Sequence, residues 1–156
     1  MNETPLRILT TEELREPQEV EAWLERFRSR FQARASGLWR REGEHLVVLG
    51  HAFAPDFDKD VAREFMAAVE SVSLERTGLG IVKAAVDDAT AVARTDAGPV
   101  DSSSWLKRFG AACSVAIPLH AGERVTGILA IALFSTQDLD AQRTALEQIA
   151  AVLPLE

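Results

Sequence analysis

The feature that most constrains this fold is a segment, residues 125–134, in which apolar side chains occupy both faces of an extended chain. Successive side chains of a strand point to opposite faces of its sheet. A strand that is apolar on both faces needs cover on both sides, so we predict a central strand with helices packed on each face of its sheet. The alternation assigns Val125, Leu129, Ile131 and Leu133 to one face, and Ile128, Ala130, Ala132 and Phe134 to the other.

The N-terminal half of the chain predicts a helix, a hairpin and a second helix. The first helix is expected to begin at Pro17 and to end near residues 36–37. Strands at 37–41 and 45–52 follow, and Asp60 is the expected N-cap of the second helix. The apolar residues expected to face inward are Val20, Trp23, Leu24, Phe27 and Phe31 in the first helix, and Val61, Phe65, Met66, Val69 and Val72 in the second.

The C-terminal half predicts a further alternation of short helices and strands. Residues 95–104 carry the clearest loop pattern in the chain, because serine, glycine, proline and aspartate are concentrated there. The expected elements are, in order, a helix at 81–86, a weak strand at 90–94, the loop at 95–104, a helix near 105–109, strands at 111–119 and 125–134, and a helix from 135–136 with Leu139, Leu146, Ile149, Ala150 and Leu153 inward.

These elements together define a mixed α/β (α+β) fold class. We expect a three-layer sandwich in which a central antiparallel sheet of five or six strands carries helices on both faces. Residues 1–16 are weakly patterned and acidic, so we interpret them as an N-terminal extension. Residues 17–156 have the length of a single domain.

Charge and composition argue against several classes of partner. The formal net charge is −7, with 24 acidic and 17 basic residues, whereas nucleic-acid binders carry a basic surface, so no nucleic acid is expected. Apolar stretches are too short to cross a bilayer, so no membrane partner is expected. The chain shows no signal-peptide pattern and its single cysteine, Cys113, permits no intrachain disulfide. We therefore expect a cytoplasmic location.

Three stretches of the sequence resemble the GAF domain family. The most specific of the three is residues 109–119 with 122–129, in which Pro118 ends one strand and Gly127 allows the next strand to pack closely. This stretch is similar to the family's "S-x-x-x-P-L … G-x-x-x-G-x-L" hairpin. The stretches are residues 35–43, residues 80–86 with 91–96, and residues 109–119 with 122–129, and together they extend over about residues 18–153.

The resemblance implies a small-molecule sensor or dimerisation module. Pockets of the family lie on one face of the sheet, beneath helices and loops between the two hairpins, and a mixture of apolar and polar groups is usual in a ligand site. The matching positions here form our candidate ligand-binding set: His51, Phe53, Phe57, Arg94, Asp96, Trp105, Phe109 and Cys113. The sequence leaves the ligand and any cofactor unidentified.

Cys113 has two readings in this set. Its place in the strand shared with Val115 and Ile117 predicts a buried residue that behaves as a small hydrophobe, and the alternative is a redox or chromophore-attaching thiol. Ser114 stands where phytochrome-like relatives carry a histidine, and the free methionine sulfoxide reductases of the family use several cysteines. The cyclic-nucleotide signature "N-K-x…F-x-x-x-D-E" is also missing, since Asn2 is the only asparagine.

Neither catalysis nor metal binding is expected from the sequence. His45, His51 and His120 are scattered, and no serine lies in a G-x-S-x-G motif, so we expect no catalytic residues and no enzyme. Asp56, Asp58 and Asp60 alternate as in a calcium loop, but the required glycine and terminal glutamate are absent.

Two functional hypotheses remain from the sequence. One is a regulatory module that binds a small molecule and passes the signal to a protein partner. The other is an interaction module without a ligand. Both include a homodimer formed through the terminal helices, because Trp23, Leu24, Phe27 and Phe31 offer more apolar bulk than one sheet face needs. A PAS-like or roadblock-like fold is a third interpretation of the same alternation.

Overall fold

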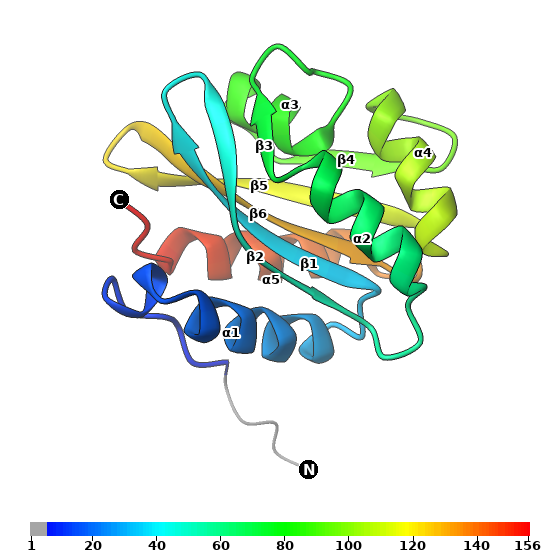
Figure 1. The fold of residues 1–156 in the computed structure, drawn as a ribbon, viewed down its shortest axis with the longest axis horizontal. Coiled ribbons are helices and arrows are strands. Elements are labelled where there is room, and N and C mark those ends of the chain that lie inside the picture. The colour runs from blue at the N-terminus through cyan, green and yellow to red at the C-terminus, as the bar shows by residue number, and fades with distance from the viewer. Residues whose placement is uncertain (1–5) are drawn as a thin grey trace.

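A computed structural model describes residues 6–156 of the chain, and its elements follow one another in the predicted alternation. Figure 1 shows the helices and strands in chain order. After a short 3₁₀ turn at Glu13–Arg15, they are α1 (Pro17–Arg30), β1 (Ala35–Glu42), β2 (His45–Phe53), α2 (Lys59–Ala68), β3 (Ser71–Ser73), α3 (Gly80–Asp87), β4 (Ala91–Arg94), α4 (Val100–Phe109), β5 (Cys113–Ala121), β6 (Arg124–Leu133) and α5 (Leu139–Val152).

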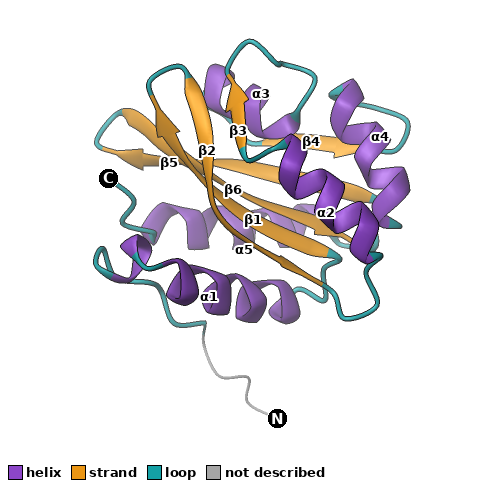
Figure 2. Ribbon diagram, viewed as in Figure 1, coloured by secondary structure: helices purple, strands orange, loops and turns teal. Residues whose placement is uncertain are grey.

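The strands form one six-stranded sheet in the order β3-β2-β1-β6-β5-β4. Every neighbouring pair is antiparallel, and β6 pairs with β1 on one side and β5 on the other. Helices α1 and α5 cover one face of the sheet, and α2, α3 and α4 lie on the other (Figure 2). The predicted fold class is therefore confirmed, and so is the central position of the strand predicted at residues 125–134, which is β6 (Arg124–Leu133).

A β-bulge corrects the predicted alternation at the start of β6. Leu119 pairs with Gly127, but His120 pairs with Val125, so Thr126 is an extra residue in this strand. Val125 consequently packs with Ile128 on the face of α3 rather than with Leu129. Phe134 was also predicted to point inward, but β6 ends before it and its side chain is 67% exposed.

The face under α1 and α5 is closed by large buried side chains. Trp23, Leu24 and Phe27 of α1 are fully buried, and Leu139, Leu146 and Ala150 of α5 pack into the same cluster. Leu9 and Leu14, from the segment before α1, belong to it as well. Of the four side chains on which the sequence-based dimer hypothesis rested, Trp23, Leu24 and Phe27 are thus buried within the fold, whereas Phe31 is only partly buried.

Helix α1 ends earlier than predicted. Gln32 adopts a φ of 51°, and the amide of Ala33 donates to the carbonyl oxygen of Arg28, which stops the helix after Arg30. The buried Arg28 side chain donates in return to the Ala33 carbonyl oxygen at 2.9 Å. This local closure places the chain in extended conformation from Ala35 onward.

The helices of the other face also depart from prediction. Asp58, not Asp60, caps α2, because its carboxylate accepts hydrogen bonds from the amides of Asp60 and Val61. Val72, predicted in that helix, lies in the edge strand β3, and Met66 is exposed.

Helix α4 occupies much of the predicted loop. It starts at Val100, directly after Pro99, although residues 95–104 carry loop-forming side chains. The amides of Asp101 and Ser102 both donate to the carbonyl oxygen of Gly78, so a distant segment supports the first turn of this helix. A contact between residues this far apart in the chain is invisible to a local pattern.

None of the helices in residues 6–156 combines the length and the apolar character that crossing a bilayer requires.

Candidate functional site

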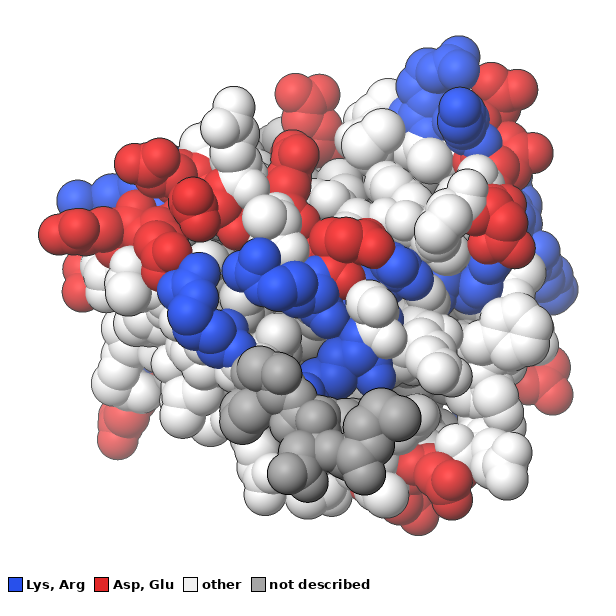
Figure 3. All heavy atoms as spheres, turned by 90° about the horizontal axis from the view of Figure 1, so that it is seen from below, with Lys and Arg blue, Asp and Glu red and all other residues white. Residues whose placement is uncertain are grey.

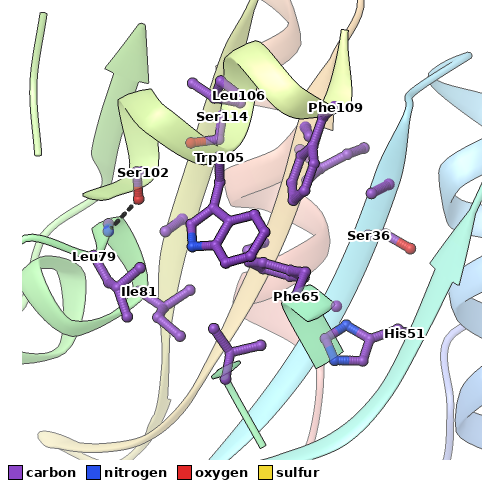
Figure 4. A pocket seen from close by; sticks show the side chains of 18 of the residues that line it. Ser36, His51, Phe65, Leu79, Ile81, Ser102, Trp105, Leu106, Phe109 and Ser114 are labelled. Carbon is purple, nitrogen blue, oxygen red and sulfur yellow. Dashed lines mark hydrogen bonds between the residues drawn. The ribbon is translucent and has the colours of Figure 1, made fainter. Parts of the chain in front are cut away.

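A cavity lies between the sheet and the helices α2, α3 and α4, and it is partly open to solvent. Its volume is about 70 Å³, whereas one water needs on the order of 10–15 Å³ of such space. Figure 4 shows its lining at close range. The side chains on which the argument depends come from five elements: Trp39 of β1, His51 of β2, Phe65 of α2, Ser102, Trp105 and Phe109 of α4, and Ser114 of β5.

Aromatic rings form one wall of this cavity. Phe65 of α2 lies edge-on to Trp105 and Phe109 of α4, with ring centroids 5.1 and 4.9 Å apart. Edge-to-face pairs at such distances stabilise by about 0.5–1.5 kcal/mol beyond their burial. The two helices therefore meet through rings above the sheet, and Figure 4 shows these rings between Ser102 on one side and His51 on the other.

Gly37 makes room for the ring that forms the floor. A Cβ atom at residue 37 would lie 2.6 Å from Cη2 and 2.7 Å from Cζ3 of Trp39. The Trp39 ring is fixed from its other end, since its Nε1 donates to the Val69 carbonyl oxygen at 2.9 Å. Glycine is thus required for the indole to lie flat across β1.

His51 supplies a polar atom without a partner. Its Nε2 is buried and makes no hydrogen bond to any described residue. The ring packs against Trp39 and Phe65, and this burial lowers the pKa of His51 to about 4. The imidazole is therefore neutral near pH 7, with one nitrogen that can donate and one that can accept.

A serine from α4 caps the N-terminus of α3 at the opposite end of the cavity. The Gly80 amide donates to Ser102 Oγ at 2.7 Å, the contact dashed in Figure 4. Residues 79–81 and Ser102 line the cavity together. Helices α3 and α4 are thereby joined at the cavity wall.

The match to a family decides what kind of domain this is. The profile described as GAF domain matches residues 18–153, which is most of the chain. This chain is a GAF domain. A search of the curated proteins finds no match for it.

Solved structures of GAF domains share its fold. The nlh2 GAF domain of A. aeolicus, solved in an inactive state, has a TM-score of 0.65 at 14% identity, covering 90% of this chain and 86% of its own. The PixJ GAF domain of Thermosynechococcus elongatus, in its blue-light-absorbing form, has a TM-score of 0.59 at 13% identity, with coverages of 92% and 85%.

An enzyme is also among the similar structures. A type II free methionine-R-sulfoxide reductase from Thermoplasma acidophilum has a TM-score of 0.53 at 12% identity and covers 88% of this GAF domain and 92% of its own chain. Identities this low show the fold alone. The fold is therefore shared by a light-absorbing domain and an enzyme, so the fold alone does not give the function.

The structure brings together three of the predicted site residues at this cavity: His51, Trp105 and Phe109. Phe53 and Phe57 do not line it, but their rings continue the aromatic cluster from His51 to Phe109, with centroids 5.7, 4.8 and 5.1 Å apart along the series. These two residues support the wall of the GAF domain cavity.

The other three predicted residues lie elsewhere. Arg94 borders a separate hollow with Arg143 of α5, and Asp96 is exposed in the turn after β4. Cys113 is buried on the α1 and α5 face, and burial raises the pKa of its thiol. Alternation along β5 explains its place, because Ser114 and Ala116 face the cavity while Cys113 and Val115 face away.

Sequence reasoning missed four contributors to this site: Gly37, Trp39, Phe65 and Ser102. Phe65 was expected only as a core residue of a helix, and Ser102 only as part of a loop. Their convergence depends on the α2–α4 and α3–α4 contacts, which no local spacing encodes. The period-two pattern of β1 does place Trp39 and Gly37 on one face, and that signal was available.

Proposed function

We propose that this GAF domain is a cytoplasmic sensory or regulatory domain that binds a small molecule in the cavity between the sheet and helices α2, α3 and α4. The observation that carries the proposal is the buried Nε2 atom of His51, which lacks a partner at the cavity wall. An unsatisfied buried polar atom costs about 1–3 kcal/mol. A ligand that bonds to this atom would recover that free energy.

The proposal is for binding without chemical conversion. His51 is the histidine that lines the cavity, and none of the described side chains donates to or accepts from its ring. Cys113, the single thiol, lies on the opposite face of the sheet. An assay of the purified protein with free methionine-R-sulfoxide is expected to show no turnover, and measurable turnover would contradict this part of the proposal.

Native mass spectrometry of the protein purified from its own cells tests the binding. We expect a retained small molecule that is released on denaturation. The variant Trp105→Ala removes part of the cavity wall and should lose it. Phe134→Ala is the matched control, because Phe134 is an exposed aromatic residue outside the cavity. A protein with no retained molecule, or equal retention in both variants, would count against the proposal.

We also propose that the domain passes its signal through a second copy or a protein partner at the α1 and α5 face. Leu6, Ile8, Phe31, Ile149 and Val152 supply the apolar part of a groove between these helices, which Arg30 and Gln148 also line, and the Val152 side chain is 57% exposed. Figure 3 views the molecule from this side and shows arginine and lysine side chains across its middle, with acidic ones gathered at the left. Such a mixture of apolar groove and opposite charges suits a self-complementary contact.

Sedimentation of two valine variants tests this association. Val152→Asp places a charge in the groove and should shift a dimer to monomer. Val86→Asp is the control, since Val86 is 53% exposed on α3 at the other face of the sheet. A monomeric unmodified protein, or an equal effect of both variants, would refute homodimerisation.

A further inference from the structure

The cavity lining within residues 6–156 contains no charged side chain. Its walls are aromatic and aliphatic, and the polar side-chain groups are the His51 imidazole, serine hydroxyls and the indole N–H groups of Trp39 and Trp105, of which Trp39 already donates to Val69. Arg108 lies close, with its guanidinium 4.8 Å from the Trp105 ring centroid, but it pairs with Glu64 and does not line the cavity. A ligand inside would thus meet no fixed counter-charge.

The N-terminus of α3 does not supply that charge either. Its Gly80 amide is already used by Ser102 Oγ, and the carboxylate of Asp101 lies against Gly78 just before the helix. That carboxylate pairs with the Arg76 guanidinium at 3.6 Å, so the two charges balance, and the Gly80 amide that would bind an anion at the helix N-terminus is already taken. The end of the cavity that a phosphate or carboxylate would seek is therefore capped.

The polar groups that remain are neutral. Ser102 Oγ accepts from Gly80, so its own hydrogen is free to be donated, since no described residue accepts it. His51 lines the opposite end, where its Nε2 is buried without a partner, and burial keeps the pKa of His51 low, at about 4. The two groups flank the aromatic rings in Figure 4.

The volume limits what fits between them. An apolar cavity of about 150 Å³ can hold a benzene molecule. At about 70 Å³, less than half of that volume, this partly open cavity encloses only part of a ring-sized molecule, and the rest of the ligand lies at the mouth. Moving an ion into such a site without a counter-charge costs several kcal/mol, far more than moving a neutral polar group that finds a hydrogen bond.

We propose that this cavity selects small uncharged molecules, of at most about one aromatic ring, that accept a hydrogen bond from Ser102 or bond to the free ring nitrogen of His51. This inference rests on the proposed ligand-binding function and names its ligand class. The inference excludes nucleotides and amino acids as ligands of this cavity, because these molecules carry full charges.

Three probes of one size and different charge test the inference. Benzyl alcohol, benzoate and benzylammonium are titrated into the full chain at neutral pH, with saturation-transfer NMR as the readout. Benzyl alcohol is expected to bind with a Kd on the order of 1 mM, and the two ions at least about tenfold more weakly. Tighter binding of either ion would overturn the ligand class but leave the proposed function standing.

Variants locate the contacts. Ser102→Ala should weaken benzyl alcohol binding about threefold to tenfold, and Ser102→Thr, which keeps the hydroxyl, should restore it. Ser104→Ala is the control, because Ser104 is exposed on the same helix. His51→Phe should weaken the alcohol but not toluene. Unchanged binding in both the Ser102→Ala and His51→Phe variants would overturn the inference.

The two proposals fail differently. If none of the three probes binds at about 10 mM, the uncharged, ring-sized ligand class is wrong. The proposed function fails on its own test, when protein from its native cells retains no molecule. A retained charged molecule would overturn the inference and support the function.

Discussion

The two faces of the sheet are covered by helices in very different ways. Under α1 and α5, Trp23, Leu24 and Phe27 are fully buried, and the Trp23 and Phe27 rings stack 5.1 Å apart. Under α2, α3 and α4, Phe65 and Trp105 are only half-buried, and a cavity remains beside them. The first face resembles an ordinary core, in which close packing supplies stability.

The difference separates a closely packed face from a face that keeps a cavity in this GAF domain. Long helices of 14 residues pack along the closed face, whereas α2, α3 and α4 have 10, 8 and 10 residues and contact the sheet at separate points. Short helices bury less apolar area each, so their face can open at lower cost. The following substitutions compare the two faces directly.

Replacing one tryptophan on each face by alanine should give the largest difference in stability. Trp23→Ala removes a fully buried indole and is expected to lower the free energy of unfolding by about 3–5 kcal/mol. Trp105→Ala, on the half-open face, should cost less than about half as much, because solvent already reaches this ring. Urea unfolding of both variants measures the difference. Equal losses would show that the cavity face is as tightly packed as the other.

Two glycines of the hairpin offer the next comparison. Gly37→Ala should cost about 1–3 kcal/mol, because its Cβ would overlap the Trp39 ring, which is anchored to Val69. Gly50→Ala faces α1, where the nearest atoms are side-chain carbons 3.1–3.4 Å away that can adjust. We expect a smaller loss there. Thermal unfolding measures both losses. A larger loss for Gly50→Ala would mean that the closed face tolerates an added methyl group less well than the cavity face.

The pH dependence of stability should report His51. Its pKa is about 4 in the folded protein against about 6.5 when unfolded, so the unfolded chain binds a proton first as the pH falls. The stabilisation that His51 contributes is fully present above about pH 6.5 and is lost as the pH falls towards 4. The free energy of unfolding should fall by up to about 1.4 kcal/mol per pH unit in this range.

The variant His51→Gln isolates that slope. Unfolding free energies at pH 7 and pH 5 are compared, a range above the titration of ordinary carboxylates. The original protein should lose about 1–2 kcal/mol more than the variant between these values. His45 and His120 are present in both proteins and cancel. Identical slopes would mean that His51 is solvated or partnered in solution.

The smallest effect is expected at the ion pair that joins α2 to α4. Glu64 and Arg108 pair with side chains 58% and 43% exposed, so Glu64→Gln should change stability by less than about 0.5 kcal/mol. On the closed face, the Arg28 side chain is only 9% exposed and bonds to Glu25 and Ala33. The variant Arg28→Gln should therefore lower the free energy of unfolding by more than about 1 kcal/mol. Urea unfolding measures both losses. A larger loss for Glu64→Gln than for Arg28→Gln would mean that the ion pair between α2 and α4 contributes more to stability than the buried Arg28.

Much of the fold followed from periodicity, because strands and helices bury faces at fixed spacing. A central strand at residues 125–134 was predicted from side chains that are apolar on both faces, and the central strand β6 occupies Arg124–Leu133. The strand β3 escaped prediction, since three residues at a sheet edge carry too short a pattern. Val125 was misassigned because a bulge, which depends on the partner strand, inverts the face of every residue before it.

The site was predicted less completely than the fold. His51, Trp105 and Phe109 were identified because the resemblance to the family pointed to their segments. Arg94 and Asp96 come from the same segment as Trp105 and Phe109, and Cys113 from the next strand, but all three face elsewhere, since neighbouring residues on a strand or turn point in different directions. A segment can be recognised from sequence, but the side chains that enter a cavity are chosen by the twist and register of the sheet.

The alternation of elements, the burial of both faces of β6 and the family of this chain can be read from the amino-acid sequence, because they depend on spacing and residue type within single segments. The contact of Ser102 with the N-terminus of α3, the packing of Phe65 on Trp105 and the unpartnered nitrogen of His51 become visible only in the folded chain. These groups are distant in the sequence, and their relative positions are set by packing and not by local preference.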